Sequence, residues 1–74
     1  MKHIIEGYIA KDGDEQGRVC LFSSKPIRGK GIFHNKQWIC PENCSYLDLP
    51  RHIFKEIKWE DEPHKVRLTV EDAD

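Results

Sequence analysis

Apolar and polar side chains alternate most regularly near the end of the chain, in residues 64–71. Val66, Leu68 and Val70 fall on one side of an extended chain there, and polar or charged side chains fall on the other. This alternation predicts a strand with one dry and one wet face. In residues 2–10 apolar side chains occupy both sides, which predicts a strand that is covered on both faces.

The middle of the chain predicts further short strands separated by turns. Residues 18–23 follow the polar, glycine-containing turn 11–17, so they are expected to form a hairpin with the first strand. Residues 32–34 and 37–40 are expected to form a second short hairpin, and 46–48 a short extended piece.

One segment, residues 50–57, has the periodicity of a helix. Ile53, Phe54 and Ile57 are three or four positions apart, and Pro50 suits a first helical turn. A helix this short must dock on other structure to be stable. The predicted fold is therefore mainly β (α+β): a small antiparallel sheet, or a partly closed barrel, of four or five strands with one short helix.

The chain of 74 residues predicts a single small domain over 1–74, with residues 71–74 fraying as a tail. A domain of this size buries little apolar surface, which favours self-association or a closed barrel. The side chains expected in the core are those on the dry faces of the predicted elements: Ile5, Ile9, Val19, Leu21, Trp38, Leu47, Ile53, Phe54, Ile57, Val66, Leu68 and Val70.

Three distinctive stretches follow one another along the chain: Tyr8-Ile9-Ala10, then Phe22 to Ile27, then Leu49 to Pro63. In this order the chain resembles a group of small uncharacterised proteins from gut bacteria and their phage-related elements. The resemblance covers most of the chain and implies a type of fold, without implying a reaction or a ligand. The loop from Cys40 to Cys44 lies outside the shared pattern.

Positive charge gathers in one part of a chain whose net charge is −1. Between Gln16 and Pro41 there are several cations and no carboxylates, with aromatic residues among them. Cations that follow phosphates and aromatics that stack on bases are the ingredients of single-strand binding. The sequence pI of about 6.4 is low for such a domain. The candidate nucleic-acid-binding residues are Arg18, Lys25, Arg28, Lys30, Lys36, Phe33 and Trp38.

The chemical state of the three cysteines has several possible interpretations. No signal-peptide pattern or membrane-spanning run occurs, so a cytoplasmic location with three free thiols is expected. A zinc site built from His34, Cys40, Cys44 and His52 is an alternative, since two nitrogens and two thiolates suit structural zinc. The histidines lack a recognised ligand spacing, so no metal or other cofactor is expected. A disulfide between Cys40 and Cys44 is a further alternative.

No motif for catalysis is present: the cysteines have no adjacent activating base in the sequence, and no glycine loop of phosphate-binding length occurs. The chain is therefore not expected to be an enzyme. The favoured hypothesis is a non-catalytic protein-interaction module, with a homodimer or another protein as partner. Single-stranded nucleic-acid binding through residues 18–38 is the alternative, and a small structural zinc protein is the lesser one.

Overall fold

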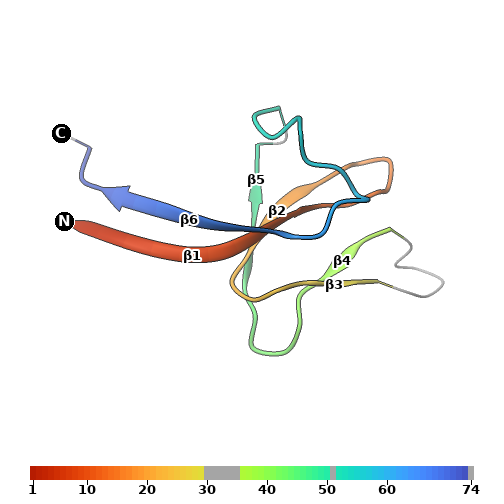
Figure 1. The fold of residues 1–74 in the computed structure, drawn as a ribbon, viewed down its shortest axis with the longest axis horizontal. Coiled ribbons are helices and arrows are strands. Elements are labelled where there is room, and N and C mark those ends of the chain that lie inside the picture. The colour runs from red at the N-terminus through yellow and green to blue at the C-terminus, as the bar shows by residue number, and fades with distance from the viewer. Residues whose placement is uncertain (30–35, 51, 74) are drawn as a thin grey trace.

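The computed structural model describes residues 1–29, 36–50 and 52–73, which form two antiparallel sheets (Figure 1). The larger sheet has the strand order β5-β2-β1-β6. Its strands are β1 (Lys2–Lys11), β2 (Val19–Phe22), β5 (Tyr46–Leu49) and β6 (His64–Glu71). The smaller sheet pairs β3 (Ile27–Arg28) with β4 (Trp38–Ile39). The prediction of a small, mainly β protein with an antiparallel sheet is confirmed.

The larger sheet is covered on both faces where β1 meets β2. Ile9 and Val19 pack with Ile57 on one face, under the segment that follows β5. On the other face Ala10, Cys20 and Phe22 form a second buried cluster, against which Trp38, Cys40 and Cys44 pack. Figure 1 shows the two covers, residues 52–63 and the β3–β4 hairpin, on opposite sides of the sheet. The prediction of a first strand covered on both faces is confirmed in this region.

The helix predicted over residues 50–57 is wrong. The described residues of this segment form two successive turns, in which the Ile53 amide donates to the Pro50 carbonyl and the Ile57 amide to the Phe54 carbonyl. Ile57 is buried and Phe54 half-buried, so the segment does dock on the sheet. Starting a helix fixes several residues for one hydrogen bond, and turns bring the same two side chains to the sheet without that cost.

The core is smaller than predicted because the sheet is longer than the segments that cover it. Ile9, Val19 and Ile57 are buried as predicted. Four of the expected core side chains are only half-buried: Leu21, Trp38, Phe54 and Val66. Five others are exposed, which contradicts their assignment to the core: Ile5, Leu47, Ile53, Leu68 and Val70.

Two details of connectivity also differ from the prediction. The partner of β4 is β3, for which no strand was predicted, whereas the predicted strand 32–34 lies outside the described residues. The predicted fraying begins too early, because Glu71 is paired with Lys2 in the sheet. Asp72 accepts a hydrogen bond of 2.7 Å from the amino group of Met1.

Candidate interaction surface

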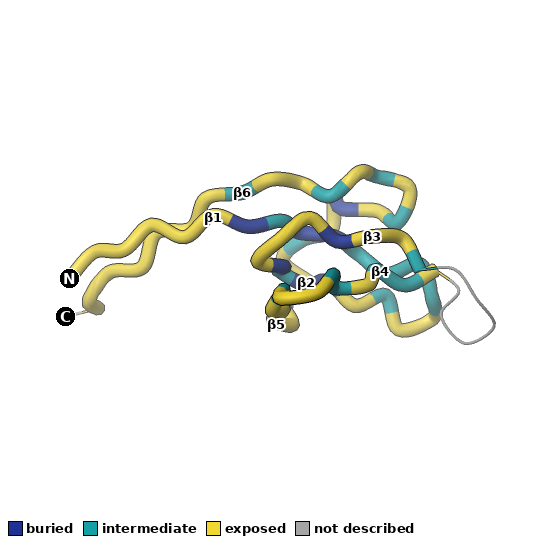
Figure 2. Tube along the Cα trace, turned by 90° about the horizontal axis from the view of Figure 1, so that it is seen from below, coloured by how far each residue is buried: buried dark blue, intermediate teal, exposed yellow. Residues whose placement is uncertain are grey.

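The first and last strands extend beyond the body of the molecule as a two-stranded arm. We define the arm as Lys2–Gly7 of β1 paired with Val66–Glu71 of β6. β2 joins β1 only from Tyr8 onward, so the arm has no third strand among the described residues. Figure 2 shows the arm reaching away from the buried part of the sheet, in a molecule with extents of 46 × 28 × 17 Å.

The arm has one apolar face, formed by Ile5, Leu68 and Val70. Residues directly opposite each other in an antiparallel pair share a face, and here Ile5 lies opposite Leu68. The exposed fractions of the three residues are 48%, 37% and 43%. Val66 continues the face inward to the cluster of Ile9 and Val19. The apolar face of the arm is therefore an uncovered extension of the core.

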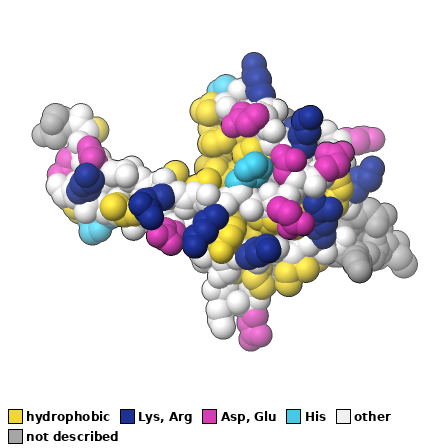
Figure 3. Space-filling view, in the orientation of Figure 1, with side chains coloured by type: hydrophobic (Ala, Val, Ile, Leu, Met, Phe, Trp, Pro, Cys, Tyr) yellow, Lys and Arg dark blue, Asp and Glu magenta, His cyan; other side chains and the backbone are white. Residues whose placement is uncertain are grey.

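The other face of the arm carries ion pairs beside one exposed apolar side chain, Ile4. Lys2 Nζ lies 3.9 Å from Glu71 Oε1, and Arg67 Nη2 lies 3.7 Å from Glu6 Oε1. Figure 3 shows basic and acidic side chains following one another along the arm. Such exposed pairs contribute little stability, but they leave this face satisfied in water. The two faces thus differ in charge, because the ion pairs lie on one of them.

The arm also has an open backbone edge. β6 is the last strand of the sheet, and no other described strand pairs with its outer side. Alternate residues of an edge strand direct their amide and carbonyl groups away from the sheet. An edge of this kind is a template for pairing with a further strand.

A second cluster joins the β3–β4 hairpin to the turn before β6. The Arg28 guanidinium lies 5.0 Å from the ring centroids of both Trp38 and Trp59, which are 5.3 Å from each other. Its Nη2 approaches the carbonyl oxygens of Trp59, Glu60 and Asp61 at 3.0–3.2 Å. We call this cluster the arginine clamp.

The turn after β1 holds the other side of Trp38. The backbone amide of Trp38 donates to Asp12 Oδ1 at 2.9 Å, and its indole Nε1 donates to the Lys11 carbonyl at 2.9 Å. Partial burial raises the pKa of Asp12, an effect that the hydrogen bond from Trp38 opposes. A hydrogen bond from Gln37 is the main reason that the pKa of Asp14 is lowered.

Among the described residues, two of those predicted to bind nucleic acid, Arg18 and Trp38, line the same open hollow. Arg28 and Trp38 come together, but their contacts lie within the protein, in the arginine clamp. Arg18, Lys25 and Lys36 are exposed and lie on separate connecting segments. Lys30 and Phe33 lie outside the described residues.

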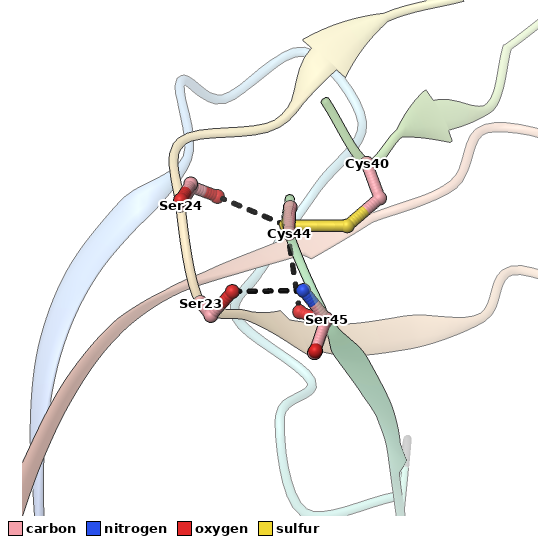
Figure 4. The surroundings of a disulfide bond; sticks show 5 residues. All are labelled: Ser23, Ser24, Cys40, Cys44 and Ser45. Atoms are coloured by element: carbon pink, nitrogen blue, oxygen red, sulfur yellow. Dashed lines mark hydrogen bonds between the residues drawn. A yellow bond between two sulfur atoms is a disulfide. The ribbon is translucent and has the colours of Figure 1, made fainter. Parts of the chain in front are cut away.

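Cys40 and Cys44 form a disulfide, so the prediction of three free thiols is wrong for this pair. Figure 4 shows the bond beside the connection between β2 and β3, where the Ser45 amide donates to Ser23 Oγ at 2.8 Å. The bond closes the start of the loop between β4 and β5 over the second buried cluster. It can form because a turn brings the two cysteines together: the Cys44 amide donates to the Pro41 carbonyl.

The structure does not assemble the zinc site considered from the sequence. Sulfurs bonded to each other are not thiolate ligands, and His52 lies in the turn after β5. His34 lies outside the described residues. Within the described part of the chain, no three His, Cys, Asp or Glu side chains are grouped to hold a metal ion.

Cys20 is a free thiol, as predicted, and it is buried in surroundings that make it unreactive. Burial, followed by the hydrogen bond to Asp48, raises the pKa of Cys20 to about 12. The thiol donates to Asp48 Oδ1 at 3.1 Å. It lines an open hollow of about 250 Å³ together with Phe22 and Tyr46. A thiol that stays protonated at neutral pH is a poor nucleophile, so this hollow has no activated cysteine.

Comparisons with models of known protein families, with curated proteins and with solved structures find no significant match. The resemblance to small proteins of gut bacteria stays a prediction. Among the described residues there is no helix long and apolar enough to cross a membrane. The arm was missed in the sequence because its residues were assigned to the core. The alternation in residues 64–71 was the available signal, but it does not reveal that β6 pairs with β1 beyond the end of β2.

Proposed function

We propose that this protein is a small, non-catalytic protein-interaction module, that the arm is its contact surface, and that its partner is a second copy of the chain. The observation that carries the proposal is the uncovered apolar face of Ile5, Leu68 and Val70, which continues the core into solvent. A two-stranded ribbon is at best marginally stable in water by itself. Contact between this ribbon and a partner therefore stabilises both the arm and the complex.

The size of the uncovered face supports a reversible dimer rather than a permanent one. Pairing at the edge of β6 covers part of the exposed surface of Leu68 and Val70 in each copy, which contributes about 1 kcal/mol for each side chain, or about 4 kcal/mol for two arms. Association costs at least about 4 kcal/mol in lost freedom of motion. The apolar contribution alone is thus close to the cost, and backbone pairing along the open edge of β6 supplies the remainder.

A dilution series of amide nuclear magnetic resonance spectra tests the proposal. Signals of the arm should shift or split between micromolar and millimolar protein, while the indole signals of the arginine clamp should stay constant. Leu68→Gln should weaken the concentration dependence. Thr69→Gln, on the polar face of the same strand, is the matched control and should retain it. Spectra that do not change with concentration contradict the proposal.

Single-stranded nucleic acid is the second candidate partner, supported by the exposure of Arg18, Lys25 and Lys36. Titration with a labelled oligonucleotide at two salt concentrations tests it, because phosphate contacts weaken as salt is raised. Saturable, salt-sensitive binding that shifts signals of these three residues would favour nucleic acid over the dimer.

A cytoplasmic location also stays a proposal, and the disulfide bears on it. Reducing compartments keep most cysteines as thiols. Alkylation of the protein inside intact cells, followed by mass measurement, reports the state of Cys40 and Cys44. Two alkylated thiols would fit the cytoplasm, and a protected pair would contradict it.

A further inference from the structure

The sequence of β6 is self-complementary about one residue, and this specifies how two copies would pair. We infer that β6 of one copy pairs antiparallel with β6 of a second copy, with Leu68 on the two-fold axis, so that two four-stranded sheets become one. The inference rests on the proposed dimer. It adds the strand, the edge and the register.

With Leu68 on the two-fold axis, apolar residues of one copy lie opposite apolar residues of the other, and cations lie opposite carboxylates. Each Leu68 lies opposite the Leu68 of the second copy, and each Val66 lies opposite a Val70. Lys65 lies opposite Glu71, once on each side of the axis. Residues opposite each other in such a pair share a face, so the apolar face of one arm continues into that of the other. The polar faces also join, with cation facing carboxylate.

Neighbouring registers are less complementary. Centring on Arg67 places the two Arg67 side chains opposite each other, and like charges in that position are unfavourable. Centring on Thr69 places Arg67 opposite Glu71 and Leu68 opposite Val70, but it also places Val66 opposite the carboxylate of Asp72. A shift that brings even-numbered residues opposite odd-numbered ones turns the apolar face of one arm to the polar side of the other. Of these registers, only the Leu68 register places Val66, Leu68 and Val70 all opposite apolar residues and also places a cation opposite a carboxylate.

The other open edges are shorter. β5 has only the four residues Tyr46–Leu49. The outer edge of β1 is open only over Lys2–Gly7, because β2 occupies it from Tyr8 onward. β6 provides eight residues, His64–Glu71. Charged side chains on an edge strand usually discourage pairing, and in this register the same charges select a second copy.

Charge exchange on the full-length chain tests the register. Lys65→Glu places two carboxylates opposite each other on both sides of the axis, and it breaks no ion pair seen in the described structure. We expect its dimer dissociation constant, measured by sedimentation equilibrium, to rise on the order of tenfold, which corresponds to about 1.4 kcal/mol. The double variant Lys65→Glu/Glu71→Lys restores opposite charges across the axis and should recover most of the wild-type affinity, less the loss of the exposed Lys2–Glu71 pair within the arm. Lys55→Glu, the same change outside the arm, should leave it unchanged.

The possible results distinguish a wrong register from the absence of a dimer. A wild-type protein that stays monomeric at millimolar concentration overturns both the proposed function and this inference. A dimer that tolerates Lys65→Glu overturns the inference alone and leaves the proposed function standing. A dimer weakened by Arg67→Glu and restored by Arg67→Glu/Glu71→Lys indicates the Thr69 register instead. Thermal melting of each variant at a concentration where all are monomers verifies that the fold is retained.

Discussion

Replacing Arg28 by alanine tests whether the arginine clamp holds the β3–β4 hairpin against the turn before β6. The guanidinium nitrogen Nη2 has two hydrogens for three nearby carbonyl oxygens, so we count two hydrogen bonds. Because Arg28 is exposed, each contributes toward the low end for charged groups, and its contacts with the two indole rings add about 0.5–1 kcal/mol. After allowance for solvent, the expected loss in Arg28→Ala is about 2 kcal/mol.

On a domain of this size, about 2 kcal/mol lowers the melting temperature by about 8–16 °C. Urea unfolding followed by tryptophan fluorescence measures the loss directly, since Trp38 and Trp59 report on the clamp itself. Arg28→Lys keeps the charge but loses the planar stacking group, so it should recover only part of the loss. Lys25→Ala, which removes an exposed cation from the preceding segment, is the control. An Arg28→Ala variant as stable as Lys25→Ala would show that the contacts of the arginine clamp do not stabilise the fold.

Two further predictions concern the cysteines. The disulfide joins residues four positions apart, and closing so short a loop stabilises the fold by about 2 kcal/mol. Reduction, or the double variant Cys40→Ala/Cys44→Ala, should therefore lower the urea concentration at the midpoint of unfolding. An unchanged midpoint would contradict this prediction. The pKa of Cys20 is raised from 9.0 to about 12 in the folded protein, so the contribution of its thiol to stability is complete below pH 9.0 and is lost as the pH rises toward 12. The free energy of unfolding of the wild type should therefore fall more steeply above pH 9.0 than that of Cys20→Ala, and parallel profiles would show that the thiol is not desolvated.

The strands were predictable because alternation reports directly on which side of a strand is dry. Val66, Leu68 and Val70 were correctly placed on one face of the last strand. What alternation does not report is which strand lies next to which, or where a covering segment ends. Leu68 and Val70 were therefore assigned to the core, although the cover formed by residues 52–63 leaves them exposed.

The helix was mispredicted because the spacing of Ile53, Phe54 and Ile57 suits a helix and also suits two successive turns. The turns direct Phe54 and Ile57 to the sheet and leave Ile53 in solvent. The arginine clamp was not predicted either, since Arg28, Trp38 and Trp59 are distant in sequence and meet only through the fold. Basic and aromatic residues that seemed suited to nucleic acid are used there for internal contacts.

Sedimentation equilibrium of the wild-type protein, from micromolar to millimolar concentration, shows whether the arm binds a second copy. If it does, the mass rises with concentration from the monomer value of 8.7 kDa toward twice that value. The same rise is expected after the disulfide is reduced, because neither cysteine lies in the arm. A mass that stays at the monomer value over the whole range would show that the arm is not a surface for a second copy.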